Sequence, residues 1–168
     1  LSVLLIIIVV ALIGPIFTKD PLSLSPMSRL KPPGEFGLFG TDQLGRDVFS
    51  RVVNGGRISL TVGLAVALCA ILVGTILGLI AGYIRALDSL IMRVMDGLMA
   101  IPAILLAIAM ISLSGASLVT VIAAIVIPEV PRVVRLVRSV VLTVREEPYV
   151  EAAISVGTPV HLIMHRHI

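Results

Sequence analysis

Residues 58–84, ISLTVGLAVALCAILVGTILGLIAGYI, decide the fold, because these 27 consecutive residues carry no charge. As an α-helix with a rise of about 1.5 Å per residue, the stretch is about 40 Å long, which exceeds the roughly 30 Å hydrocarbon core of a bilayer. The stretch is therefore predicted to be a transmembrane helix.

The composition of the chain also indicates a membrane protein. Of its 168 residues, 58% are hydrophobic and 14% are charged, and the mean hydropathy is +1.13. A soluble domain is about 45–50% apolar and about 25% charged. The apolar residues are gathered in blocks too long to be buried in a core of this size, which excludes a water-soluble monomer. The lipid bilayer is the first expected partner.

Two further apolar segments flank this helix. Residues 1–17 are predicted to be a clipped first transmembrane helix, because the apolar run is already in progress at Leu1. Residues 97–128 form 32 uncharged residues, about 48 Å as one helix, which is too long for one span and too short for two with a turn. A hairpin is predicted instead, with its turn in the polar residues 112–117 and its spans over about 89–111 and 117–140.

The remaining segments are polar. Residues 18–57 are rich in proline and glycine and are predicted to be a connector, of which residues 46–57 form a short helix at the membrane surface. Residues 58–168 then form the core of the protein, with a charged loop over about 143–168. The connector has six basic residues and the opposite side has seven, so the distribution of basic residues does not decide the orientation in the membrane.

Small residues recur every four positions along the helix over 58–84, at Ala70, Gly74, Gly78 and Gly82. Residues with this spacing share one helix face, and their small size lets another helix backbone approach closely. The pattern predicts a helix-packing face, either as a static contact or as one that slides during transport.

Several charged residues lie close to the predicted spans. Asp96 and Glu129 are candidates for a solute or ion pathway, but Glu129 and Arg132 are also spaced for a helical ion pair. Arg132, Arg135 and Arg138 recur every three residues, as in a voltage sensor. We favour interfacial roles for all of them, with the arginines directed toward lipid headgroups.

The sequence carries no motif for catalysis, for a metal site or for nucleic-acid binding. Cys69 is the one cysteine, no Gly-Lys-Ser/Thr phosphate loop occurs, and no catalytic residue is predicted. Two of the three histidines, His161 and His165, are spaced like metal ligands, but no cysteine or carboxylate lies nearby. The basic residues are interspersed with apolar blocks, and the chain has no tryptophan, which argues against nucleic acid as a partner.

Two motifs resemble those of one family. The stretch 40–60 begins GTDQLGRDVFSR and is similar to the segment before the second span in permease subunits of ABC importers for dipeptides, oligopeptides and nickel. Its matching positions are Gly40, Thr41, Asp42, Gly45, Arg46 and Asp47. Residues 149–157 resemble the Glu-Ala-Ala loop of importer permeases, with Glu151, Ala152, Ala153 and Gly157 at the matching positions.

The resemblance implies a fold, a cellular location and a membrane topology. The fold would be an all-α, polytopic helical bundle of the type I ABC importer permease fold, with about four of six spans present in a chain truncated at both ends. The protein would be a multi-pass component of the bacterial or archaeal inner membrane. The connector 18–57 would be extracytoplasmic, and the loop 143–168 would be cytoplasmic.

The resemblance also implies partners and a function. The chain would bind no cofactor itself, would not be an enzyme, and would import peptides or a related small solute such as nickel. Its partners would be a second permease subunit, ATP-binding subunits that use ATP and magnesium, and an extracytoplasmic solute-binding protein. An ion channel or a secondary transporter that uses the intramembrane Asp, Glu and Arg residues is the alternative.

Overall fold

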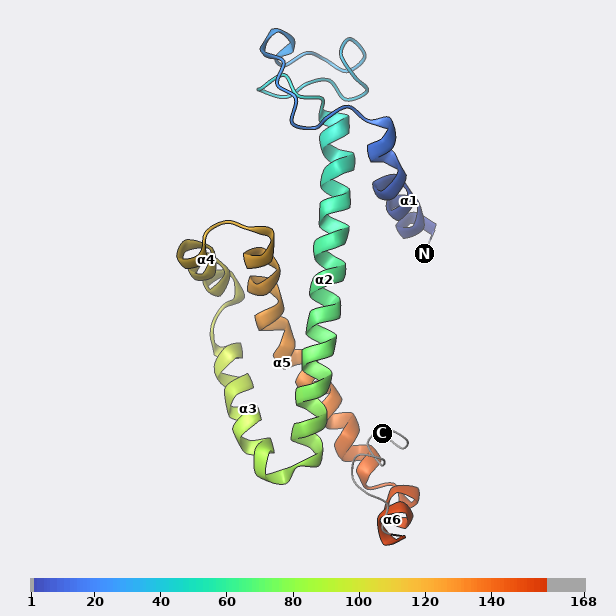
Figure 1. Ribbon diagram of the computed structural model, residues 1–168, viewed down its shortest axis with the longest axis vertical. Coiled ribbons are helices and arrows are strands. Elements are labelled where there is room, and N and C mark those ends of the chain that lie inside the picture. Colours follow the sequence, from blue (N-terminus) through green and yellow to red (C-terminus); the bar gives the residue numbers. More distant parts are fainter. Residues whose placement is uncertain (1, 157–168) are drawn as a thin grey trace. The chain divides into compact units, whose positions relative to one another are not determined.

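The structure is a computed structural model that describes residues 2–156, with the backbone alone described for residues 151–154. Its elements, in chain order, are α1 (Ser2–Phe17), the 3-10 helix η1 (Pro26–Ser28), α2 (Val48–Tyr83), α3 (Arg85–Ala100), α4 (Ala103–Ser114), α5 (Leu118–Arg145) and α6 (Pro148–Ser155). No strand occurs within residues 2–156, so the predicted all-α fold is confirmed (Figure 1). The chain divides into two units, residues 1–64 and residues 65–168.

In the first unit, α1 packs against the beginning of α2. Ala11 of α1 is buried. A β-carbon on Gly14 would lie only 2.5 Å from Cγ1 of Val53 in α2, so this close approach requires a residue without a side chain. The backbone N–H of Lys19, just after α1, donates a hydrogen bond to the Ser50 hydroxyl at 3.1 Å. These contacts bring the two ends of the connector together.

The helix α2 begins at Val48, not at residue 58 as predicted. The carboxylate of Asp47 accepts a hydrogen bond from the backbone N–H of Ser50 at 3.0 Å and thereby satisfies a donor that the first turn leaves free. Residues 48–57 continue directly into the apolar helix, so the separate surface helix predicted over 46–57 is wrong. The cap and the packing of Val53 on α1 outweigh the cost of the helical glycines 55 and 56, about 1 kcal/mol each.

In the second unit, a sharp bend separates α3 from α4. The two helices meet at 86°. Pro102 is the physical reason, because its ring disfavours a helical conformation for the preceding residue, and Ile101 has φ −88° and ψ 123°. The segment predicted as a span over about 89–111 is therefore broken at residues 101–102 into α3 and α4.

The turn between α4 and α5 coincides with the predicted polar segment 112–117. Gly115 has a φ of +80°, a conformation that glycine adopts without strain. The hydroxyl of Ser117 then accepts a hydrogen bond from the backbone N–H of Thr120 at 3.1 Å and caps α5. From there α5 runs without interruption past Pro128 and Pro131 to Arg145.

The core of the second unit lies between α3 and α5. Met95 of α3 and Val130 and Val134 of α5 are buried together, and Leu77 of α2 packs against them. In Figure 1, α3 (yellow-green) and α5 (orange) run in opposite directions along each other. This antiparallel pairing decides which charged residues of the two helices meet.

Membrane spans can be assigned by length and composition. Among the described residues, α2 alone is long and apolar enough to cross a bilayer, and the bent pair α3 and α4 meets the same criterion if it is taken as one span. The helix α1 is apolar but has only 16 residues. The spans over 1–17 and 117–140 thus remain predictions from the sequence.

Candidate functional site

Three of the four arginines of α5, Arg132, Arg135 and Arg138, each pair with an acidic side chain. Arg132 bonds Glu129 one turn earlier on the same helix, with Nη1 2.8 Å from Oε1. Arg135 reaches Asp96 of α3, with Nη2 2.6 Å from Oδ1. The ion pair predicted from the spacing of Glu129 and Arg132 is confirmed. The prediction that all three arginines point toward lipid headgroups is wrong for Arg135 and Arg138, whose charges are directed at α3.

The third arginine, Arg138, makes the most complete pair. Its Nε lies 2.5 Å from Oδ1 of Asp88 and its Nη2 lies 2.6 Å from Oδ2, so both carboxylate oxygens are engaged by one guanidinium. Both side chains are half-buried, with 29% and 26% of their surface exposed. A bidentate ion pair of this kind fixes the relative orientation of the two side chains as well as their distance. It therefore joins the beginning of α3 to the last turns of α5.

The small residues of α2 face α5. A β-carbon on Gly74 would lie 2.5 Å from Cβ of Val133, and one on Gly78 would lie 2.7 Å from Cβ of Val137. A β-carbon on Gly82 would lie 2.7 Å from Cβ of Val141. No side chain fits at these three positions without movement of α5.

Ala70, the first member of the series of small residues, is buried. The series of small residues thus begins one helical turn before Gly74, on the same face of α2. Through this face α2 contacts the helix that also pairs with α3, so α5 is held by two neighbours of the second unit.

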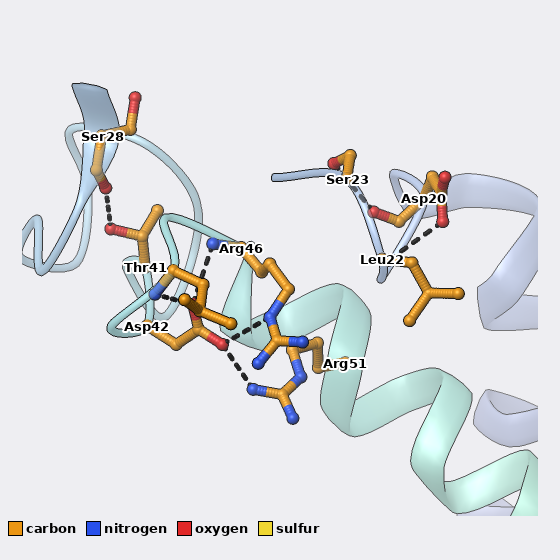
Figure 2. A network of polar contacts seen from close by, with 9 residues as sticks. Asp20, Leu22, Ser23, Ser28, Thr41, Asp42, Arg46 and Arg51 are labelled. Carbon is orange, nitrogen blue, oxygen red and sulfur yellow. Dashed lines mark hydrogen bonds and ion pairs between the residues drawn. The ribbon is translucent and has the colours of Figure 1, made fainter. Parts of the chain in front are cut away.

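Asp42, the first charged residue of the connector motif, organises the connector itself. Its Oδ1 accepts hydrogen bonds from the backbone N–H groups of Leu44 at 2.8 Å and Arg46 at 3.0 Å. Its Oδ2 receives the guanidinium of Arg46 at 2.8 Å and that of Arg51 at 2.5 Å (Figure 2). Arg51 belongs to α2, so Asp42 ties the loop to the helix that follows it.

The same contacts set the protonation of Asp42. Desolvation acts to raise the pKa of this carboxyl, but the backbone N–H groups of Arg46 and Leu44 and the Arg46 guanidinium together outweigh it. They hold the pKa well below its usual range. The carboxylate is therefore charged at any physiological pH.

The other motif residues fold the connector around Asp42. Thr41 accepts a hydrogen bond from the backbone N–H of Lys31 at 2.9 Å. It also donates one to the carbonyl oxygen of Ser28 (Figure 2). Gly40 and Gly45 have φ values of +73° and +75°, and each lies directly against backbone atoms of residues 25–33. Side chains at these two positions would strain the backbone and meet the facing chain. Together with Asp47, which caps α2, the motif residues build the connector.

The Glu-Ala-Ala segment lies in α6. Glu151, Ala152 and Ala153 belong to this helix of eight residues. Val150, beside them, is fully buried, and α6 contacts α5. Gly157 and the three histidines lie outside the described residues.

The described site residues form ion pairs and close helix contacts. Within residues 2–156, no group of three or more histidine, cysteine, aspartate or glutamate side chains is arranged to hold a metal ion. The ion pairs of Arg132, Arg135 and Arg138, the contacts of the α2 glycines and α6 all involve α5. Sequence reasoning missed the pairs of Arg135 and Arg138 with α3 and the contribution of Arg51, because these partners are 9 to 50 residues apart.

Comparison with known proteins identifies the relatives of this chain. Residues 70–168 match the family model described as binding-protein-dependent transport system inner membrane component. A probable peptide ABC transporter permease of Sinorhizobium fredii is 54% identical over 94% of this chain and 54% of its own length. A dipeptide transport system permease of Alkalihalophilus pseudofirmus is 42% identical over 96% of this chain and 54% of its own.

A less similar relative aligns over a comparable share of both chains. An oligopeptide transport system permease of Bacillus subtilis is 34% identical over 100% of this chain and 56% of its own length. The chain thus spans about half the length of the curated relatives that it matches.

Proposed function

Because the chain belongs to the family of binding-protein-dependent transport system inner membrane components, we propose that it forms part of the permease subunit of an ATP-driven peptide importer. The peptide substrate is supported by the names of the relatives, which are peptide, dipeptide and oligopeptide permeases. The family consists of membrane components of transport systems, so the proposed role is passage of the solute and not a chemical reaction.

The position of α6 is the main support for the proposed mechanism. This short helix follows α5 after a two-residue break and contacts it. It holds the Glu151-Ala152-Ala153 segment, and small residues on a helix permit close approach of a partner surface. We assign α6 as the cytoplasmic coupling helix, which an ATP-binding subunit would hold.

The contacts of α5 support a route for motion from α6. The valines of α5 abut Gly74, Gly78 and Gly82 of α2, and Arg138 pairs with Asp88 of α3. A displacement of α6 by the closing ATP-binding subunits would move α5, and these contacts would carry α2 and α3 with it. Such rocking of one group of helices against another gives alternating access to a solute site.

The proposed partners follow from this mechanism. A second permease subunit would complete the pathway, two ATP-binding subunits would use ATP and magnesium, and an extracytoplasmic binding protein would deliver the solute. The connector of residues 18–47, with its folded Asp42 network, would face the binding protein. The chain itself would bind neither nucleotide nor metal.

The alternative function, an ion channel or secondary transporter, receives less support. It would use Asp96, Glu129 and the arginines as pathway groups. Asp96 is paired with Arg135 and Glu129 with Arg132, so the charges that a pathway would need are already neutralised.

Co-purification of the full-length permease with its ATP-binding subunits tests the proposal. Glu151→Arg reverses a charge in α6, and we expect loss of the ATP-binding subunits from the purified complex. Gly157→Pro should have the same effect. Glu35→Arg is the matched control, because it makes the same charge change in an exposed part of the connector.

The expected control result is retention of the complex by Glu35→Arg. If Glu151→Arg and Gly157→Pro both retain ATP-binding subunits at the wild-type ratio and with wild-type ATPase activity, α6 is not the coupling helix.

A further inference from the structure

A polar cavity of about 420 Å³ opens where α2, α3 and α5 meet. Its lining comes from the end of α2, the first turn of α3 and the end of α5, with Ala81, Gly82, Arg85, Asp88, Leu142, Arg145 and Glu146. Cavities of about 300–1,000 Å³ are typical of small-ligand sites in proteins. Gly82 and Asp88 also take part in the proposed coupling contacts, whereas Arg85, Arg145 and Glu146 do not.

The charged side chains that line the cavity differ in whether they already have an ion-pair partner. Both oxygens of the Asp88 carboxylate are engaged by Arg138. Arg85 makes no ion pair with any residue of the described range 2–156. Glu146 likewise has no ion pair within the part of the chain that the structure describes, so two guanidiniums, of Arg85 and Arg145, line the cavity together with this carboxylate.

Arg145 is held in place by the end of α2. Its guanidinium carbon lies 5.5 Å from the centre of the Tyr83 ring, and its Nη1 donates a hydrogen bond to the Tyr83 carbonyl oxygen at 3.4 Å. A cation over a tyrosine ring is attracted by the negative face of the ring. These contacts leave further donors of the guanidinium open to a ligand, since arginine has five N–H groups.

The cavity lies at the end of the candidate membrane span α2, where a membrane surface is expected. The apolar helix α2 ends at Tyr83, and charged residues begin with Arg85. Tyrosine is enriched at the boundary between hydrocarbon and headgroups, where its ring is apolar and its hydroxyl reaches water. Phospholipid phosphates are concentrated at this depth, and basic pockets between transmembrane helices bind lipid headgroups.

We propose that this cavity binds the headgroup of a phospholipid that carries both a phosphate and a primary ammonium group. The phosphate is held by Arg85 and Arg145, because guanidinium groups bind phosphate through charge-assisted hydrogen bonds. The ammonium group faces Glu146. Phosphatidylethanolamine has this pair of charges, whereas phosphatidylglycerol lacks the ammonium and phosphatidylcholine lacks its N–H donors.

Lipid retention by the purified full-length permease tests this site. The protein is exchanged into detergent with equal amounts of phosphatidylethanolamine, phosphatidylglycerol and phosphatidylcholine, and retained lipid is counted by native mass spectrometry. We expect preferential retention of phosphatidylethanolamine. Arg85→Gln should reduce its affinity about tenfold, which is the effect of losing a hydrogen bond to a charged group.

Matched variants separate the site from general charge effects. Arg93→Gln removes an exposed arginine of the same helix that does not line the cavity, and we expect it to retain lipid like the wild type. Glu146→Gln should abolish the preference for phosphatidylethanolamine over phosphatidylglycerol while both lipids stay bound. Arg145→Gln should resemble Arg85→Gln.

Three results would overturn the proposal. They are equal retention of all three lipids by the wild type, unchanged retention by Arg85→Gln and Arg145→Gln, or displacement of the lipid by soluble phosphoethanolamine at equal concentration. The test needs no ATP-binding subunit, so its outcome is independent of the proposed transport function.

Discussion

Arg138 and Asp88, fifty residues apart in the sequence, form an ion pair in which one guanidinium engages both carboxylate oxygens at 2.5 and 2.6 Å. The pair joins the end of α5, which leads to α6, to the beginning of α3. It is the strongest polar contact between these two helices, because the second pair, Arg135 with Asp96, involves a single hydrogen bond and more exposed side chains.

Removal of either member of this pair should destabilise the protein. Asp88→Asn and Arg138→Gln are each expected to lower the free energy of unfolding by about 1–2 kcal/mol, since each leaves a half-buried charge without its partner. The measurement is the thermal stability of the purified full-length permease. In a double-mutant cycle the combined variant should be less destabilised than the sum of the single variants.

The exposed pair of Glu129 and Arg132 provides the comparison. Glu129 is 40% and Arg132 is 69% exposed, so Glu129→Gln should change stability by less than about 0.5 kcal/mol. Additive effects of Asp88→Asn and Arg138→Gln would show that the two residues do not interact.

The contact between α2 and α5 should not tolerate even one methyl group at Gly78. A β-carbon there would lie 2.7 Å from Cβ of Val137, so Gly78→Ala forces the helices apart and should cost about 1–3 kcal/mol. Gly63→Ala, in the same helix, meets no atom within 4 Å. It should instead stabilise α2 by about 0.5–1 kcal/mol, because alanine favours helix more than glycine does. Equal thermal stabilities of the two variants would contradict the close packing.

The connector should lose stability in acid through Asp42. Its pKa is lowered in the folded protein, so its contribution is complete above the usual aspartate pKa of about 3.9 and is lost as the pH falls toward the folded-state value. We expect amide hydrogen exchange in residues 40–47, corrected for intrinsic rates, to be slow at pH 6 and to accelerate below about pH 4.

The variant Asp42→Asn should exchange rapidly at both values of pH. Acceleration of the same size in Asp42→Asn as in the wild type would show that another group controls the connector.

Local features of the fold could be predicted from the sequence, and contacts between distant segments could not. The turn at residues 112–117 follows from a local polar cluster, and the Glu129–Arg132 pair follows from helical spacing. The bend at Pro102 and the early start of α2 have local signals in the proline and in Asp47, but the lengths of the uncharged runs favour different helix boundaries. The pairs of Arg135 and Arg138 depend on the antiparallel placement of α3 and α5, which no local pattern specifies.

The same distinction applies to the candidate site. The small residues at Gly74, Gly78 and Gly82 predict a packing face, but only the structure gives its partner, the valines of α5. The motif residues of the connector were recognised by resemblance, and the physical reason for Asp42 is the set of N–H donors that it gathers from residues 44–51.

The topology can be tested with introduced cysteines. Cys69 is the one cysteine of these 168 residues and lies in the apolar part of α2, so a membrane-impermeant maleimide should not label it in intact cells. Glu35→Cys should be labelled from outside, because the connector is expected to be extracytoplasmic. Glu147→Cys should be labelled only after lysis. Labelling in the reverse order would invert the proposed orientation and remove α6 from the cytoplasm.

The most direct test of the central claim is solute uptake by the full-length permease, reconstituted in vesicles with its second permease, ATP-binding subunits and binding protein. The proposed function predicts accumulation of a labelled peptide that requires ATP and magnesium and is abolished by Glu151→Arg. Accumulation driven by a proton or sodium gradient in vesicles without ATP-binding subunits would contradict it.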